Sequence, residues 1–426
     1  MIKKEVKGIG QDVYIETLDN GLKIYLVPFK NRKNYYINYV TKFGSINNKF
    51  VPVNKNEVVK VPYGVAHFLE HKMFEQEDGI DPFKFFSKYG SDANASTGYK
   101  TTSYTVNGVN NIEENLDFLL TYVNSPYFTE ENIKKEKNII IEEINMYNDE
   151  PEGKLYEKSS KAIFKYHPMR IDIGGTEKSV RSINKENLYD CYNTFYQPSN
   201  MSLFIGGNFE VDKIIKVIKN NKALQSNSIK EQIKVETCKE PLKVNSNFEE
   251  IKIENLVIPK LIFTLKISLK ELHEKERFKY TLLLNLLIGI LYGGSSQFRE
   301  QMLNEGKMSI FATSKAIVDD FLILEFMAES KVPKELADKI KKVFIEKEIT
   351  EEEIKRHKKI YIANEVLKSD QVVSTVNMIT ANVIDYNDII YDKIDMVKNI
   401  SIDDILDVRK TIDIENSSLV IAYPKE

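Results

Sequence analysis

Short β-prone runs and longer segments with a helical spacing of apolar residues follow one another along the first half of the chain. The β-prone runs predict strands at residues 22–28, 35–43, 91–97, 101–106 and 200–206. Apolar positions three and four residues apart predict helices at residues 64–74, 82–89, 112–123, 129–147, 153–164, 185–195 and 211–220. Strands that precede runs of helices favour an α+β fold, in which helices cover each sheet.

The second half repeats the first in three places and in the same order. Residues 129–143 match 350–364 without a gap, residues 199–207 match 415–423, and residues 89–97 match 305–313 more weakly. The alternative is coincidence among charged helices, but two of the three matches are strands at equivalent places. We therefore predict a duplicated α/β unit.

The chain has 426 residues, which is too long for one hydrophobic core, since single cores stop growing near ~250–300 residues. Residues 221–250 are polar, rich in Lys, Asn, Ser and Glu, and show no periodicity. They predict a linker between a first domain at residues 1–220 and a second at residues 251–426.

The composition excludes several classes of protein. Hydrophobic residues make up 42% and charged residues 29%, which is typical of a globular chain and not of a disordered one. A net charge of −3 favours neither nucleic acid nor an anionic membrane as partner. Cys191 and Cys238 are too few and too far apart for a disulfide framework or a cysteine zinc site.

Nothing in the sequence predicts a targeting or membrane segment. The first residues are charged, without an apolar signal region. The longest apolar run, residues 282–292, is shorter than the roughly 20 residues of a membrane crossing. We therefore expect a cytoplasmic protein with no membrane partner.

The sharpest local motif is His67-Phe-Leu-Glu70-His71, the inverted H-x-x-E-H form of the zincin motif. Positions i and i+4 lie on one face of a helix, so both imidazoles can reach one ion. The Glu70 carboxylate projects beside them, where it can take a proton from a metal-bound water. The alternative is a solvated helix face that happens to carry two histidines.

A site with two histidines needs a third protein ligand, usually a carboxylate. The predicted helix at residues 129–147 offers Glu136, Glu142 and Glu143. Glu136 and Glu143 are two turns apart and share a face, whereas Glu142 points about 100° away from Glu143. We choose Glu143 as the ligand and Glu136 as a carboxylate that orients a ligating histidine. A surface charge is the alternative for any single glutamate here.

These residues resemble those of the pitrilysin/insulinase family of zinc metallopeptidases, the inverzincins, in the short-chain subgroup related to mitochondrial processing peptidase and its bacterial homologues. The resemblance is carried by His67-Phe-Leu-Glu-His-Lys-Met-Phe, Asn94-Ala-Ser-Thr and residues 136–147. His167-Pro, Gly174-Gly-Thr and residues 193–200 also fit. The resemblance spans most of the first half of the chain and, more faintly, the second half.

The resemblance implies one zinc ion per chain, with His67, His71 and Glu143 as ligands and Glu70 as general base. Glu136 then matches the acidic residue two turns before the third ligand. The implied fold has two homologous α/β domains, each a mostly antiparallel sheet covered by helices, which together form half of a clamshell.

The same resemblance makes the strand with Asn94, Ala95 and Ser96 an edge strand that binds peptide substrate by β-addition. An ordinary amphipathic strand is the alternative interpretation.

The second half lacks these ligands. In the repeat alignment Asn364 replaces Glu143 and His357 replaces Glu136, and the helix near residues 281–292 has neither His nor Glu. We therefore expect a non-catalytic copy. We interpret His273 and His357 as surface residues, and His167 as a structural loop residue.

Many relatives carry an Arg and a Tyr seven residues apart in this half, which clamp substrate. The matching positions here are Leu303 and Ile310, and Arg299 is followed seven residues later by Gly306. The resemblance thus implies a heterodimer with a zinc-less homologous subunit that supplies the Arg/Tyr pair. A homodimer is the second choice.

We expect a zinc endopeptidase that hydrolyses peptides or unfolded segments inside a chamber. One alternative is a peptide-binding or assembly subunit of a peptidase-like heterodimer, without hydrolysis. Another is a zinc-stabilised chamber that binds peptides without cutting them.

Overall fold

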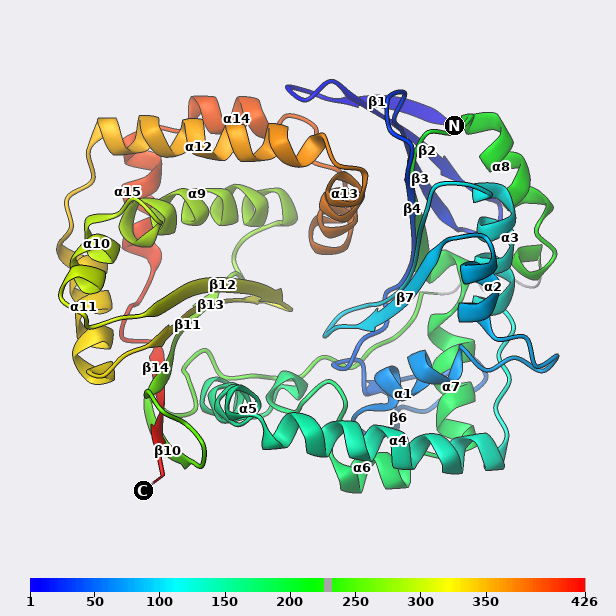
Figure 1. The fold of residues 1–426 in the computed structure, drawn as a ribbon, viewed down its shortest axis with the longest axis horizontal. Helices are drawn as coiled ribbons and strands as arrows, with labels where there is room; N and C mark the ends of the chain where they lie inside the picture. The colour runs from blue at the N-terminus through cyan, green and yellow to red at the C-terminus, as the bar shows by residue number, and fades with distance from the viewer. Residues whose placement is uncertain (226–231, 426) are drawn as a thin grey trace.

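The computed structural model describes residues 1–225 and 232–425 and contains two large β-sheets with helices packed around them (Figure 1). The first sheet has seven strands in the order β1-β2-β3-β9-β4-β8-β7. The second has five strands in the order β10-β14-β11-β13-β12. A small sheet of β5 and β6 lies in the first half.

The first half contributes nine strands and eight α-helices among the described residues. The strands are β1 (Ile2–Val6), β2 (Gln11–Thr17), β3 (Lys23–Pro28), β4 (Tyr35–Thr41), β5 (Lys49–Phe50), β6 (Val59–Lys60), β7 (Asp92–Thr97), β8 (Thr102–Gly108) and β9 (Met201–Gly207). The helices are α1 (Val65–Lys72), α2 (Pro82–Lys88), α3 (Ile112–Val123), α4 (Glu130–Asp149), α5 (Pro151–Ile163), α6 (Glu177–Ser182), α7 (Lys185–Phe195) and α8 (Val211–Asn220).

The described part of the second half contains five strands and seven α-helices. The strands are β10 (Phe248–Ile253), β11 (Lys260–Ser268), β12 (Ile310–Val318), β13 (Phe321–Glu329) and β14 (Ser417–Pro424). The helices are α9 (Glu274–Tyr292), α10 (Gln297–Asn304), α11 (Pro333–Glu346), α12 (Glu351–Ser369), α13 (Val372–Tyr386), α14 (Lys393–Asn399) and α15 (Ile402–Thr411).

The two sheets share one topology. Strands β3-β9-β4-β8-β7 correspond one to one, in order, with β10-β14-β11-β13-β12. In both sheets the first of these pairs is parallel and the other three are antiparallel. The three sequence matches fall on α4 and α12, β9 and β14, and β7 and β12. The predicted fold of two homologous α/β units with mostly antiparallel sheets is confirmed.

Helices pack on both faces of each sheet. On one face of each sheet, the packed helix belongs to the other half of the chain. Alternate residues of a strand face opposite sides of its sheet. Ile24 and Ile37 of the first sheet pack with helices of their own half, whereas Tyr36 and Phe204 pack against α13. Helix α5 likewise packs on β11 and β14 of the second sheet (Figure 1).

The predicted helices and strands of the first half all exist, with ends that differ by one or two residues at most. Strands β1 and β2 were not predicted. Four of the five residues of β1 are exposed, so this edge strand lacks the apolar run that marks a buried strand. Main-chain hydrogen bonds to β2, not apolar burial, define it.

The predicted linker at residues 221–250 is only partly described, because residues 226–231 lie outside the described residues. After this gap the chain packs beside β5, where the main chains of Lys49 and Val51 bond to Glu236 and Lys234. The domain limits at residues 220 and 251 stay a prediction.

The interpretation of His357 as a surface residue is wrong. His357 lies on α12 with only 7% of its surface exposed, and α12 packs against α9. A Cβ at Gly289 would lie 3.1 Å from Nδ1 of His357, so the missing side chain of that glycine makes room for the ring. His273 is exposed at the start of α9, and His167 is buried in a loop, as expected.

One described segment, Glu274–Asn304, is long and apolar enough to cross a membrane by length and composition. However, 67% of its most apolar window is buried inside the protein, where α9 forms the centre of the second core. This is typical of a core helix.

Candidate functional site

Both motif histidines lie on the short helix α1, which neighbouring segments hold in place. It begins after Gly64, whose φ of 86° is a left-handed conformation that glycine adopts at little cost. A Cβ at Gly64 would lie 2.2 Å from the carbonyl oxygen of Gly174. The Gly174–Gly175 segment therefore packs directly against the start of α1. Phe68 and Leu69 are fully buried and fix the rotation of the helix.

Helix α4 brings the third candidate ligand to these histidines. Oε2 of Glu143 lies 3.9 Å from Nε2 of His67 and 3.8 Å from Nε2 of His71. One ligand atom from each of the three residues lies within 4.8 Å of the others. Glu142, the neighbouring candidate, is exposed. The structure thus brings together His67, His71 and Glu143, as predicted, and leaves Glu142 outside the cluster.

The donor set suits a divalent transition metal such as zinc. Two imidazole nitrogens and one carboxylate oxygen form the ligand set of many catalytic zinc sites, which leave a fourth position open. With bonds of about 2.0–2.2 Å, one ion can bridge ligand atoms up to about 4 Å apart, and the two distances to Glu143 fall within this limit. Burial, and then the neighbouring His71, lower the pKa of His67 to about 4, so its ring is neutral as metal binding requires.

Glu136 lies behind His71, on the side of the ring away from Glu143. Its Oε1 is 2.9 Å from Nδ1 of His71, and its side chain is 8% exposed. Burial opposes ionisation, but the contacts with His71 and with Lys72, 3.8 Å away, outweigh it and lower the pKa of Glu136. A charged carboxylate at Nδ1 fixes the tautomer that directs the lone pair of Nε2 to the metal position.

Glu70 lies on α1 between the two histidines, is buried, and takes no part in the three-residue cluster. Its Oε2 accepts a hydrogen bond of 2.5 Å from the hydroxyl of Thr97 on β7. Burial raises the pKa of Glu70, although the bond from Thr97 opposes this rise. A carboxyl group with a raised pKa is suited to accept a proton and return it.

Strand β7 is the edge of the first sheet and pairs only with β8 among the described strands. Asn94 and Ser96 are exposed and Ala95 is half-buried. Helix α1, which carries the histidines, contacts this strand. This placement fits the prediction that Asn94, Ala95 and Ser96 bind substrate, but their role stays a prediction.

Two features of the site were not predicted. Thr97 was recognised only as part of the strand, yet its hydroxyl holds Glu70. Lys72, directly after the motif, has no exposed side-chain surface and pairs with Glu75 at 2.6 Å and with Glu136 at 3.8 Å. Lys72 is the last residue of a helix whose buried face is otherwise mainly apolar. A lysine at such a position was the available signal for this ion pair.

The equivalent place in the second half, between α9 and β12, holds no such cluster among the described residues. Leu303 and Ile310 stand at the positions aligned with the Arg/Tyr pair and are 47% and 57% exposed. Arg299 donates to the carbonyl oxygen of Phe311 at 2.5 Å and lies over the ring of that residue.

Two homologous α/β units, of which only the first carries H-x-x-E-H, define an inverzincin-type fold. The family profile described as "Insulinase (Peptidase family M16)" matches residues 59–177, and "Peptidase M16 inactive domain" matches residues 182–361. The chain is 41% identical to the uncharacterized zinc protease YmfH of Bacillus subtilis (strain 168) over 330 residues, which are 77% of this chain and 74% of the relative. The chain belongs to the insulinase family, peptidase family M16.

Solved structures agree with this family. An M16-like protein from Alicyclobacillus acidocaldarius superposes with a TM-score of 0.92 and 29% identity, over 99% of this chain and 100% of that one. Pitrilysin superposes with a TM-score of 0.75 and 15% identity, over 99% of this chain but 46% of its own. Since several relatives are named zinc proteases, a peptidase function that uses zinc is supported.

Proposed function

We propose that this chain is a zinc endopeptidase that hydrolyses peptides or unfolded segments inside a chamber, with Glu70 as the general base. The observation that carries the proposal is the cluster of His67, His71 and Glu143 within 4.8 Å, with the buried carboxylate of Glu70 on the same helix. Helix α1 contacts the edge strand β7, and Thr97 of that strand bonds to Glu70.

Zinc, when bound by the two Nε2 atoms and the Glu143 carboxylate, supplies a Lewis acid that acidifies water and polarises a carbonyl group. Glu70 takes the proton of the attacking water and returns it to the leaving amine. Thr97 holds the Glu70 carboxylate in place through its hydroxyl. Glu136 holds the His71 ring. The main chain of β7 aligns the peptide as an added strand, which binds many sequences because main-chain atoms make the contacts.

The replacement Glu70→Gln tests this function. It keeps the size of the side chain but removes the base, so we expect full zinc content and loss of peptide hydrolysis. Zinc content is measured by elemental analysis and hydrolysis with a quenched fluorescent peptide. Full turnover by Glu70→Gln would reject the role of Glu70, and no hydrolysis by the zinc-loaded wild-type protein with any partner would reject the function.

We further propose that the active form is a heterodimer with a zinc-less homologous chain that supplies an Arg/Tyr pair. Leu303 and Ile310 cannot perform this role, and Arg299 is engaged by Phe311. The match to 46% of pitrilysin supports the view that two such chains enclose one chamber. If the purified chain alone hydrolysed peptides at full rate, with activity proportional to chain concentration down to the monomer, the heterodimer would be rejected.

A peptide-binding or assembly subunit without hydrolysis is the second candidate, favoured by the match of residues 182–361 to an inactive domain. Most of that match lies in the second half, where the described residues contain no histidine cluster. The first half keeps all four motif residues in a geometry fit for metal, which favours hydrolysis.

A further inference from the structure

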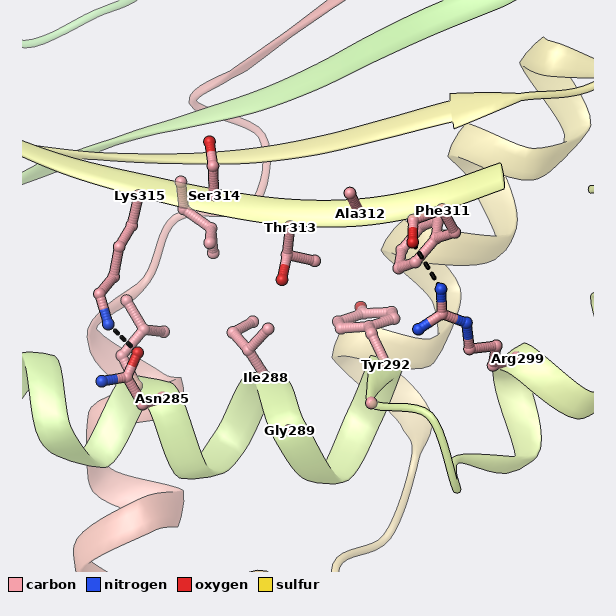
Figure 2. A pocket seen from close by; sticks show the side chains of 13 residues that line it. Asn285, Ile288, Gly289, Tyr292, Arg299, Phe311, Ala312, Thr313, Ser314 and Lys315 are labelled. Atoms are coloured by element: carbon pink, nitrogen blue, oxygen red, sulfur yellow. Dashed lines mark hydrogen bonds between the residues drawn. The ribbon is translucent and has the colours of Figure 1, made fainter. Parts of the chain in front are cut away.

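A cavity of about 310 Å³ lies in the second half, between α9, α10 and β12. We call this cavity the β12 groove. Figure 2 shows its floor, formed by side chains of α9, and its roof, formed by β12. Ile288 and Tyr292 make the middle of the floor apolar, while Lys315 and Arg299 lie at opposite ends.

The β12 groove occupies the place that corresponds to the metal cluster of the first half. Helix α9 and strand β12 are the equivalents of α1 and β7 in the shared topology. Like β7, β12 is an edge strand that pairs with one neighbour only among the described strands. Both edge strands lie on the sides of their sheets that face the middle of the molecule (Figure 1). A peptide held at β7 therefore has a second free strand edge across from it.

The charged groups of the β12 groove are cations that lack a counter-ion. Nζ of Lys315 donates a hydrogen bond to Oδ1 of Asn285 on α9. Among the described residues, no carboxylate forms an ion pair with Lys315 or Arg299, and no acidic residue lines the groove. Figure 2 shows the Lys315 ammonium and the Asn285 amide turned toward each other across one end.

Asp385 is the acidic group that acts on Lys315 from nearby, and it is already paired with another lysine. Its carboxylate lies 2.6 Å from Nζ of Lys100. Asp385 therefore does not form an ion pair with Lys315. Lys315 is exposed to solvent at the end of the groove, and an ammonium group there without an ion-pair partner among the described residues favours the binding of an anion.

We propose that the β12 groove binds an extended segment of the peptide substrate through a carboxylate that contacts Lys315 and the amide of Asn285. The proposal rests on the proposed peptidase function, and it adds a preference for substrates with an acidic group. The carboxylate is either an acidic side chain or the C-terminal group of the peptide. Main-chain bonds to β12 align the segment, and the apolar floor takes the side chains that point into the groove.

Arg299 lies at the opposite end of the groove from Lys315, where it would be near the other end of the bound segment. It lies over Phe311, four residues before Lys315 on β12, which corresponds to about 13 Å along a strand. One carboxylate therefore cannot contact both cations. Since the guanidinium already donates to a main-chain carbonyl, Lys315 is the stronger candidate for selecting the acid.

The charge state of Lys315 supports this assignment. Partial dehydration, and then the ammonium groups of Lys393 and Lys368, lower the pKa of Lys315 to about 8, whereas Asp385 opposes this effect. These same groups make the site electropositive. A bound carboxylate would relieve the repulsion that the ammonium group experiences.

The test uses the full-length Glu70→Gln protein, which binds but does not cut. Fluorescence anisotropy gives its affinity for three labelled peptides of the same sequence: one with a glutamate and a free C-terminus, one with glutamine in its place, and one with an amidated C-terminus. We expect loss of the relevant carboxylate to weaken binding about tenfold or more, as for a charge-assisted hydrogen bond. A loss on Glu-to-Gln exchange assigns an acidic side chain, and a loss on amidation assigns the C-terminus.

The replacement Lys315→Met in the same protein should weaken binding of the acidic peptide to the level of the neutral one and leave the neutral peptide unchanged. Lys252→Met, at an exposed position on the opposite edge strand β10, is the matched control and should change neither. Equal affinity of Lys315→Met and its parent for the acidic peptide would reject the groove, as would an equal loss for all peptides.

Hydrolysis by wild-type protein separates this proposal from the proposed function. Cleavage without selectivity for a carboxylate would reject the groove but not the peptidase. Carboxylate-selective binding without cleavage would reject the peptidase but not the groove.

Discussion

The buried carboxylate of Glu136 contacts Nδ1 of His71 at 2.9 Å, which leaves Nε2 of the same ring directed to Glu143. The two glutamates lie on one face of α4, two turns apart, and so contact the two nitrogens of one imidazole. One helix thus supplies both a candidate metal ligand and the group that orients another.

Replacement of Glu136 by Gln should weaken zinc binding about 10–100-fold, because the neutral amide no longer fixes the tautomer and orientation of His71. Competition with a chromophoric chelator measures the affinity. Glu142→Gln, on the exposed side of the same helix, is the matched control and should bind zinc like the wild type. Equal affinities for both variants would show that Glu136 has no part in metal binding.

Replacement of Thr97 by Val should lower kcat about tenfold or more while zinc content stays unchanged. The change keeps the shape of the side chain but removes the hydroxyl that donates to Glu70 at 2.5 Å, and a hydrogen bond to a charged group contributes about 1.5–3 kcal/mol. Thr97→Ser retains the hydroxyl and should restore most of the activity. If Val and Ser variants had the same kcat, the bond would be irrelevant to catalysis.

The local part of the site could be predicted because it depends only on the helical repeat. The spacing of His67 and His71 fixes a common face whatever surrounds the helix. The choice of Glu143 over Glu142 needed only the register of α4 relative to Glu136. The order of strands and helices likewise followed from apolar patterns, since most elements bury one face in a core.

The features that the sequence did not predict depend on contacts between segments far apart in the chain. No local pattern of residues encodes such contacts. The burial of His357 requires that Gly289 of another helix lie against its ring. The packing of α13 on the first sheet requires the second half to reach back to the first. The β12 groove needs a lysine of β12 and an asparagine of α9 to meet. Each depends on a tertiary arrangement that the repeat alignment suggested only in outline.

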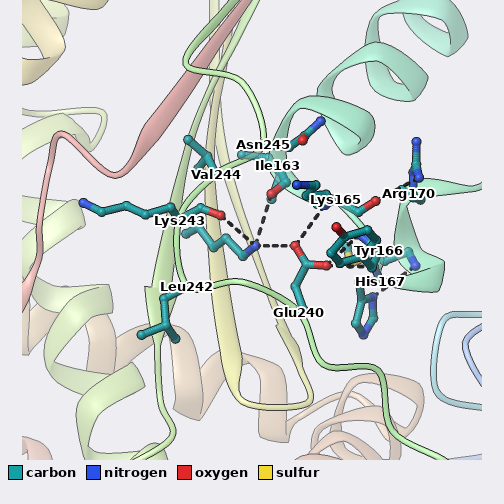
Figure 3. A network of polar contacts seen from close by, with 12 residues as sticks. Ile163, Lys165, Tyr166, His167, Arg170, Glu240, Leu242, Lys243, Val244 and Asn245 are labelled. Atoms are coloured by element: carbon teal, nitrogen blue, oxygen red, sulfur yellow. Dashed lines mark hydrogen bonds and ion pairs between the residues drawn. The ribbon is translucent and has the colours of Figure 1, made fainter.

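A buried ion pair between Lys266 of β11 and Glu240 joins the predicted linker segment to the second sheet, and Glu240 also binds the loop that follows α5. Nζ of Lys266 lies 2.7 Å from Oε1 of Glu240, and these side chains are 0% and 1% exposed. The Glu240 carboxylate also accepts bonds from the main-chain N–H groups of Lys165, Tyr166 and His167, toward which it points in Figure 3. Burial opposes its ionisation, but Lys266 and these N–H groups lower the pKa of Glu240 on balance.

Replacement of Lys266 by Met should lower the free energy of unfolding by about 3–5 kcal/mol, because it leaves the Glu240 carboxylate buried without its cation. Urea unfolding followed by circular dichroism measures the change. Lys243→Met, which removes an exposed ammonium group paired with Asp413 at 3.3 Å, is the control and should cost less than about 1 kcal/mol. Similar costs for the two variants would contradict the structural role of the buried pair.

The same pair predicts how stability depends on acid. Since the folded pKa of Glu240 is lowered, its contribution to stability is complete above the ordinary glutamate value of about 4.3. It is lost as the pH falls through the lower, folded value. The difference in stability between wild type and Glu240→Gln should therefore shrink below about pH 4. A difference that stays constant down to pH 3 would contradict the lowered pKa.

The affinity of the β12 groove for an acidic peptide should fall as the pH rises through about 8, the pKa of free Lys315. Below this pH Lys315 is protonated both free and bound, so affinity stays level. Above it, binding must be accompanied by uptake of a proton, and the affinity falls by up to tenfold per pH unit until the pKa of the bound state is reached. Asp385 and the ammonium groups of Lys393 and Lys368 act on the same site, and burial lowers the pKa of Lys393 as well, so a matched variant of residue 315 is needed.

Lys315→Arg separates this titration from other effects of alkaline pH, because a guanidinium group keeps its charge above pH 12. Anisotropy titrations of the Glu70→Gln protein from pH 6.5 to about pH 9.5 should show the fall, and the same protein with Lys315→Arg should show a level profile. A level profile with Lys315 present, or an equal fall with arginine, would show that the ammonium group of residue 315 does not bind the carboxylate.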